Sequence, residues 1–210
     1  MQVKKREIRA KILQTAKTEF KSNGFEKSTM RSIAQKSIIT TSNIYNYFKS
    51  KDDLFMEIVE PTLSKIDLAL SDMENQHFSG DPDFLSHESM KNQFEAAIKF
   101  IDRHRQDLNL ILFKSYGSSI QNYKEQFINR YSDIFIKQLK YLEKADSQLN
   151  TQISRFFLHN LCSLYTNIVV EIVMHDISYE KMRQYSKEFL TFAFNGQRAL
   201  IGLENGDYNR

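Results

Sequence analysis

The sequence predicts an all-α fold of about nine helices, and three observations support it. The 210-residue chain contains only six Gly and two Pro, fewer turn residues than many short strands would need. Apolar residues recur at three- and four-residue spacing along most of the chain. Ser or Thr residues precede several of these apolar runs, where their hydroxyls can cap helices. We expect an N-terminal three-helix domain at residues 1–52 and a C-terminal helical bundle at residues 53–210 that dimerises.

The first helix is expected to end at about Ser22. Its apolar positions, from Ile8 to Phe20, recur at helical spacing. Gly24 follows where a C-terminal cap would lie, because glycine adopts the left-handed conformation that often ends a helix.

Two short helices are expected next. Ser28 or Thr29 can cap the second helix, and Thr40 or Thr41 can cap the third. Only a few residues connect them, which predicts a helix-turn-helix.

The fourth helix has the clearest start signal in the chain. The hydroxyl of Ser50 can accept a hydrogen bond from the backbone N–H of Asp53, while the Asp53 carboxylate reaches back. The helix should continue to about Met73, with a bend near Pro61. Residues 75–85, which include Gly80 and Pro82, are predicted to form a loop.

Helical patterns return after this loop. We expect helices near residues 86–105, 106–115, 118–145, 151–175 and 179–203. The helix from Thr151 is apolar around most of its circumference, so it must be covered on two sides. The final helix has a three- and four-residue seam suited to helix packing, with Gly196 allowing close approach. A second copy of the chain would cover both helices. The predicted dimer interface comprises Phe157, Leu161, Leu164, Ile168, Met182, Tyr185, Phe189, Phe192 and Gly196. A larger core within one monomer is the alternative.

Charge is divided unevenly along the chain. Residues 1–55 hold twelve Lys and Arg against five Asp and Glu, a net charge of +7, and the remainder carries −4. Such asymmetry indicates a polyanionic partner for the N-terminal segment, although a basic helix face can also be merely solvated.

The segment from Thr29 to Phe55 resembles the signature of the TetR family of regulators. The resemblance covers residues 7–57 and is strongest in Ile44-Tyr45-Asn46-Tyr47-Phe48-Lys49-Ser50-Lys51, followed by Leu54-Phe55. Two positions depart from the family pattern. Ile38 occupies the place of a turn glycine, so the turn must avoid a positive φ or tolerate strain. Ser32 replaces an acidic residue that caps the second helix.

The resemblance implies which residues meet DNA. Small hydroxyls let a recognition helix approach base edges, Asn43 can pair with adenine, and tyrosine hydroxyls reach phosphates. We expect specificity to rest mainly on Thr41 and Asn43. Lys51 is expected to meet a phosphate, and Tyr47 is the tyrosine expected to pack against Phe48 instead. The full predicted set is Thr29, Arg31, Thr40, Thr41, Ser42, Asn43, Tyr45, Asn46, Tyr47 and Lys51.

The resemblance further implies a homodimer on a pseudo-palindromic double-stranded operator, acting as a repressor released by a small hydrophobic ligand. Pro61, in the linking helix, could transmit the effect of that ligand. Candidate ligand-binding residues are the aromatic and polar side chains interleaved on the inner helices, although such stripes are more often plain core. They are Phe94, Phe113, Tyr116, Tyr131, Phe135, His159, Asn160, Cys162 and Tyr165.

Other classes of protein are weighed against this hypothesis. An enzyme is not expected, because the sequence has no GxGxxG, P-loop, HExxH, GxSxG or paired CxxC motif and its five histidines are dispersed. His159 and Cys162 have no second pair with which to hold a metal, so neither a metal nor a cofactor is expected. A helical interaction module without DNA binding is a further alternative, as is an activator or a ligand-independent regulator.

The chain is expected to be cytoplasmic and not in a membrane. No apolar run of signal-peptide type follows Met1, and the apolar stretch 161–174 is short for a bilayer and contains Asn167 and Glu171. A single cysteine agrees with a reducing compartment.

Overall fold

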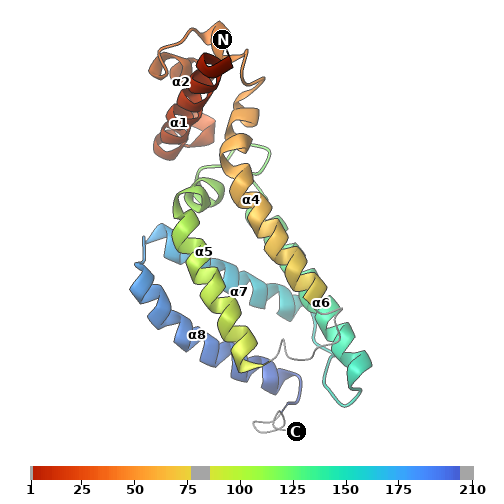
Figure 1. Ribbon diagram of the computed structural model, residues 1–210. Coiled ribbons are helices and arrows are strands. Elements are labelled where there is room, and N and C mark those ends of the chain that lie inside the picture. The colour runs from red at the N-terminus through yellow and green to blue at the C-terminus, as the bar shows by residue number, and fades with distance from the viewer. Residues whose placement is uncertain (1, 77–85, 204–210) are drawn as a thin grey trace. The chain divides into compact units, whose positions relative to one another are not determined.

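The computed structural model describes residues 2–76 and 86–203, and it contains eight helices and no strand within them. The all-α prediction is confirmed. Figure 1 labels most of the helices along the chain. They are α1 (Gln2–Lys27), α2 (Met30–Lys36), α3 (Thr41–Ile44), α4 (Lys51–Gln76), α5 (His87–Phe113), α6 (Tyr123–Ala145), α7 (Arg155–Met174) and α8 (Tyr179–Leu200).

Two helices contain internal breaks, and one break accounts for the difference from nine predicted helices. Helix α5 joins the two helices expected at 86–105 and 106–115, with a non-helical conformation at His104 (φ −109°, ψ 15°). In α1 the break lies at Gly24 (φ 75°, ψ 168°), the glycine expected to end the first helix. The positive φ explains why glycine suits this position, since a Cβ would be strained there.

The described chain divides into two compact units. The first comprises residues 1–65 and 105–124, and the second comprises residues 66–104 and 125–210. The boundary predicted between residues 52 and 53 concerns a division of function and stays a prediction. Of the predicted loop at 75–85, Asn75 and Gln76 end α4, and residues 77–85 lie outside the described residues.

Aromatic side chains form the centre of the first unit. The ring of Phe20 lies 5.0 Å from that of Phe55 and 5.9 Å from that of Phe25, and the Phe25 and Phe55 rings are 5.3 Å apart. Ile33, Ile44 and other apolar residues of α1 to α4 complete this core. Residues Leu110, Ile111 and Ile120, from the end of α5 and the segment after it, belong to the same core. The helix-turn-helix is therefore packed partly by residues far along the sequence.

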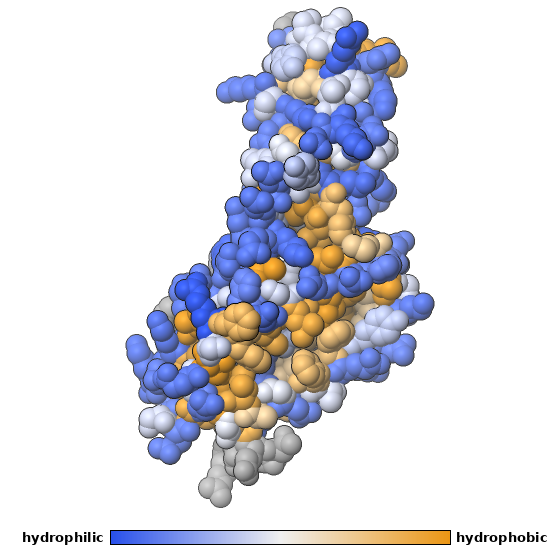
Figure 2. Space-filling model, turned by 180° about the vertical axis from the view of Figure 1, so that it is seen from behind, coloured by the Kyte–Doolittle hydropathy of each residue, from blue (hydrophilic) through white to orange (hydrophobic). Residues whose placement is uncertain are grey.

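The second unit leaves large apolar side chains on its surface. On α7, Phe156 is 79% exposed, and Phe157, Leu164 and Met174 are also exposed; on α8, Tyr185 and Phe192 are exposed. Figure 2 shows wide apolar areas on the surface of the C-terminal part of the chain. Among the described helices, α7 alone is long and apolar enough to cross a membrane by length and composition, and only 22% of its apolar window is buried. One such helix is weak evidence for a membrane protein. An apolar row exposed on a single chain also suits a second helix as its cover.

Candidate nucleic-acid interface

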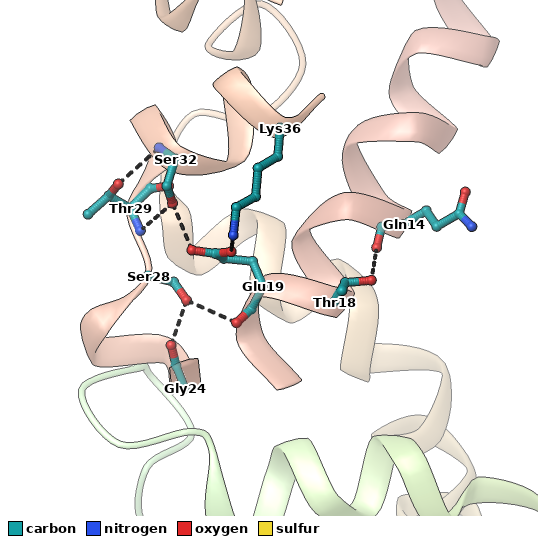
Figure 3. Close-up of polar contacts among 8 residues, drawn as sticks. All are labelled: Gln14, Thr18, Glu19, Gly24, Ser28, Thr29, Ser32 and Lys36. Atoms are coloured by element: carbon teal, nitrogen blue, oxygen red, sulfur yellow. Dashed lines mark hydrogen bonds and ion pairs between the residues drawn. The ribbon is translucent and has the colours of Figure 1, made fainter. Parts of the chain in front are cut away.

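Helix α2 begins in a hydrogen-bonded cap. The hydroxyl of Thr29 accepts from the backbone N–H of Ser32 at 3.0 Å, and the Ser32 hydroxyl accepts from the N–H of Thr29 at 3.4 Å. Of the two caps that the sequence leaves open, the structure uses Thr29. Ser28 instead donates to the carbonyl oxygen of Gly24 at 2.7 Å, which ties the start of α2 to the end of α1. These contacts are drawn in Figure 3.

A buried carboxylate supplies the negative charge that Ser32 lacks. Glu19 of α1 accepts from the Ser32 hydroxyl at 2.9 Å and forms an ion pair with Lys36 at the other end of α2 (Figure 3). The hydrogen bond from Lys36 lowers the pKa of Glu19, against the opposing effect of burial, and Ser32 lowers it further. One side chain of α1 thus contacts both ends of α2. The sequence did not identify Glu19, because its pairing with α2 depends on the packing of the two helices.

The turn between α2 and α3 tolerates strain, which was one of the two outcomes expected at Ile38. Ile38 has φ 59° and is 82% exposed. Its backbone N–H donates to Gln35 O at 3.0 Å, and the next N–H, of Ile39, donates to Ala34 O at 3.0 Å. A residue with a Cβ costs about 1–2 kcal/mol in this left-handed region, and a β-branched residue is a clear outlier there.

Helix α3 is a single short turn that presents small polar groups. Thr40 is its N-cap, and the Thr40 hydroxyl accepts from the N–H of Asn43 at 3.2 Å. The hydroxyls of Thr40 and Ser42 are 3.1 Å apart, and the Asn43 side-chain oxygen accepts from the amide of Asn46 at 3.2 Å. Thr40, Thr41, Ser42 and Asn46 are exposed, whereas Asn43 is half-buried. The structure therefore brings the predicted recognition residues together on a capped turn.

The two tyrosines after α3 have different surroundings. Tyr45 is 50% exposed, while Tyr47 is half-buried and packs against the core that contains Phe48. The prediction that Tyr47 is the packed tyrosine is confirmed. Before the turn, Thr29 and Arg31 are both exposed.

Lys51, the first residue of α4, contacts protein carbonyls. Its ammonium donates to Phe25 O at 2.7 Å, to Ser28 O at 2.9 Å and to Glu26 O at 3.4 Å, and it lies 4.2 Å from the centre of the Phe25 ring. Burial lowers the pKa of Lys51, and the charge of Glu26 opposes this shift. The side chain therefore binds the corner between α1 and α2. A phosphate contact for Lys51 stays a prediction, and it would compete with these carbonyls.

The same corner is held by residues that follow α5. The backbone N–H of Phe25 donates to Lys114 O at 2.8 Å, and the N–H of Ser119 donates to the Asp52 carboxylate at 2.8 Å. Beside this carboxylate, the predicted start signal of α4 is present, since Asp53 N–H donates to the Ser50 hydroxyl at 2.9 Å. Nothing in the sequence signalled that residues 114–119 would reach this corner.

The candidate ligand-binding residues do not form one group. Tyr131, Phe135, Cys162 and Tyr165 lie in the second unit. The Tyr131 ring is 5.3 Å from that of Phe135 and interacts electrostatically with Cys162 and Tyr165. Burial raises the pKa values of Tyr131 and Tyr165 and raises that of Cys162 to about 11. Phe94 packs in the same apolar cluster as Tyr165, and His159 is half-buried.

Several candidates lie elsewhere. Phe113 and Tyr116 belong to the first unit, and Tyr116 is 69% exposed. Asn160 is exposed and its amide donates to Phe156 O, so it shares the exposed side of α7 with Phe156. The prediction that Tyr116 and Asn160 line a pocket is therefore corrected, because both side chains are exposed and a pocket wall needs side chains directed inward.

The predicted dimer residues are mostly accessible, with one correction. Phe157, Leu164, Tyr185 and Phe192 are exposed, and a Cβ added to Gly196 would meet nothing within 4 Å. Leu161, Ile168 and Phe189 are half-buried. Met182 is only 1% exposed, so it belongs to the core of its own chain. A residue enclosed in this way offers no surface to a partner.

Comparison with known proteins identifies the helix-turn-helix segment. Residues 12–58 match the family described as bacterial regulatory proteins, tetR family. An uncharacterized HTH-type transcriptional regulator, YfiR of Bacillus subtilis (strain 168), is 39% identical over 56 residues. This match covers 27% of the present chain and 27% of that relative.

Solved structures share the fold over most of the chain. A putative fatty acid metabolism regulator of Clostridium perfringens matches with a TM-score of 0.60 and 19% identity, covering 89% of this chain and 97% of that one. NalD, the secondary repressor of the MexAB-OprM multidrug efflux pump in Pseudomonas aeruginosa, matches with a TM-score of 0.59 and 16% identity. The match covers 86% of this chain and 94% of NalD. FadR of Bacillus subtilis, solved with stearoyl-CoA, matches with a TM-score of 0.58 and 15% identity. The match covers 93% of this chain and 99% of FadR.

At such identities the structural matches show the fold alone. The family match falls on residues 12–58, the segment that contains α2, the strained turn and α3. Over this N-terminal segment, the chain is similar to the tetR family of bacterial regulatory proteins.

Proposed function

We propose that the chain is a transcription regulator that binds a specific double-stranded operator through α3. The observation that carries this proposal is the exposed hydroxyl pair of Thr41 and Ser42 on a capped turn, within a segment of net charge +7. The positive charge attracts the phosphate backbone, and small hydroxyls allow close approach to base edges. The chain acts as a cytoplasmic regulator and not as an enzyme.

The roles of the surface residues follow from their exposure. Thr41, Ser42 and Asn43 read base edges, while Thr29, Arg31, Tyr45 and Asn46 contact the backbone or an outer base. Thr40 acts mainly as the helix cap, and Tyr47 acts through packing. Lys51 is not assigned to the DNA-contacting group, because its ammonium already donates hydrogen bonds to three backbone carbonyls.

The regulator works as a homodimer, so its operator is a pseudo-palindrome. The exposed apolar residues of α7 and α8, chiefly Phe156, Phe157, Leu164 and Phe192, support this part of the proposal. A soluble monomer would leave these side chains in water, whereas pairing removes them from it.

Repression is released by a small hydrophobic ligand held among the helices of the second unit. The rings of Tyr131, Phe135 and Tyr165 offer an apolar lining, and the hydroxyls of Tyr131 and Tyr165 offer polar anchors. Among the structural neighbours, one is a putative fatty acid metabolism regulator and another, FadR of Bacillus subtilis, was solved in complex with stearoyl-CoA. A long-chain acyl compound is therefore the first ligand to test.

DNA binding is tested by fluorescence anisotropy on labelled DNA from beside the gene, at two salt concentrations, with scrambled DNA as control. We expect tighter binding to the native sequence and a steep fall in affinity with salt. If binding to both DNAs is weak and equal, a binding site is next sought by selection from random sequences. If that selection also yields no site, the chain is better interpreted as a helical interaction module without DNA binding.

Ligand release is tested separately by adding stearoyl-CoA to the protein–operator complex. Free coenzyme A serves as the control, because it lacks the acyl chain. Release by stearoyl-CoA but not by coenzyme A supports the acyl ligand, whereas no release by either removes support for that class and leaves DNA binding untouched.

A further inference from the structure

Ile38 combines two properties that oppose stability. Its φ of 59° lies in the left-handed region, where β-branched residues are rare, and its large apolar side chain is 82% exposed. Glycine would relieve the first problem, and a polar residue would relieve the second. The side chain contributes little to the apolar core of its own chain.

The neighbouring residue shows the contrast. Ile39 is half-buried and packs against the core formed by α1 to α4. Two isoleucines thus stand side by side in the turn, one used by the fold and one left on the surface. Strained residues that persist without a packing role are characteristic of functional sites.

Ile38 also lies beside the proposed recognition residues. It precedes the α3 cap, Thr40, by two positions, and Thr41 and Ser42 follow. The amino-terminal end of a recognition helix is the part that approaches base edges in the major groove. The side chains from Thr40 to Asn43 are all polar, so Ile38 is the large apolar group at this end of the surface.

We propose that Ile38 is a specificity-determining residue that contacts the C5-methyl group of a thymine in the operator. This inference rests on the proposed DNA-binding function. The thymine methyl group is the apolar feature that the major groove presents, and aliphatic side chains read it by van der Waals contact. The contact would give the exposed, strained isoleucine a role that glycine could not fill.

The test begins with a binding site selected from random duplexes by the full-length protein. Each thymine of that site is then replaced in turn by deoxyuridine, which lacks only the C5-methyl group. Binding is measured for the native protein, for Ile38→Gly and for Ile39→Ala as the control variant. Thermal unfolding of all three proteins is recorded alongside.

We expect one thymine replacement to weaken the native protein by about fourfold, as the loss of one buried methyl group implies. The same replacement should leave Ile38→Gly unaffected, and this variant should unfold at a higher temperature than the native protein while binding the thymine duplex more weakly. Ile39→Ala should unfold at a lower temperature and keep the native discrimination between thymine and deoxyuridine.

Two results would overturn the assignment. The native protein could bind every deoxyuridine duplex as well as the thymine duplex, or Ile38→Gly could retain the native discrimination. Failure to select any site is a different outcome, because it refutes the proposed function itself. The temperature measurement separates a lost methyl contact from a misfolded turn.

Discussion

Replacing Lys51 by methionine tests whether its ammonium serves the fold or a phosphate. Methionine keeps the apolar stem and removes the charge. The native ammonium makes two short hydrogen bonds, 2.7 Å to Phe25 O and 2.9 Å to Ser28 O, and lies 4.2 Å from the Phe25 ring centre. A hydrogen bond from a charged group contributes about 1.5–3 kcal/mol, and a cation–π contact about 0.5–1 kcal/mol at an exposed site.

Water can replace part of this interaction because Lys51 is only half-buried. We therefore take the lower part of these ranges and expect the free energy of unfolding to fall by about 2–3 kcal/mol. The measurement is urea unfolding at fixed protein concentration, read as a lower midpoint with an unchanged slope. Lys49→Met is the matched control, since Lys49 is exposed two residues earlier and its loss should change stability by no more than about 0.5 kcal/mol.

DNA binding supplies the second half of this test. If Lys51 acts through the α1–α2 corner, Lys51→Met weakens operator binding without changing the dependence of affinity on salt. A lysine that neutralises a phosphate would instead lower the salt slope by about one when it is removed. If Lys51→Met keeps the native stability and lowers the salt slope, a structural role for Lys51 is refuted and a contact between Lys51 and a DNA phosphate is supported.

Four further predictions follow from the structure. Asn43→Ala should relax operator preference by about 1–3 kcal/mol at one base position in a binding-site competition, and uniform weakening at all positions would contradict this role. Phe192→Arg should produce monomers in analytical ultracentrifugation, whereas Lys187→Arg, also exposed on α8, should remain dimeric. Glu19→Gln should destabilise the protein at neutral pH but less so in acid: the folded-state pKa of Glu19 is lowered, so its contribution exists above the ordinary value of 4.5 and is lost as the pH falls below it. Cys162 should react slowly with iodoacetamide at pH 8 in the folded protein and rapidly in urea, because its pKa is raised to about 11; fast alkylation of the folded protein would show that the thiol is accessible.

Local sequence patterns predicted the parts of the fold that depend on neighbouring residues. Gly24, a threonine cap at Thr40 or Thr41, and the Ser50 hydroxyl at the start of α4 were predictable because each acts within a few residues of its own position; the structure uses Thr40. The packing of Tyr47 followed from its place beside Phe48. The family resemblance added the functional reading of these residues.

Features that join distant segments could not be predicted in this way. The contact of Glu19 with Ser32 and Lys36 requires α1 and α2 to be packed already. Burial of Met182 in its own chain, and exposure of Asn160, depend on which face of α8 and α7 meets the other helices. Periodicity locates an apolar face, but it does not say whether the same chain or a second one covers it.

The participation of residues 105–124 in the first unit has a consequence for protein engineering. Leu110, Ile111 and Ile120 fill the core beneath the helix-turn-helix, and Lys114 accepts the hydrogen bond of Phe25. A fragment truncated after α3 would expose that core and lose that bond. In a chimeric regulator that exchanges only the first fifty residues, the foreign helices would pack against residues 105–124 of this chain, to which their side chains are not matched. A transplant that retains its native stability must carry two separate stretches of this chain.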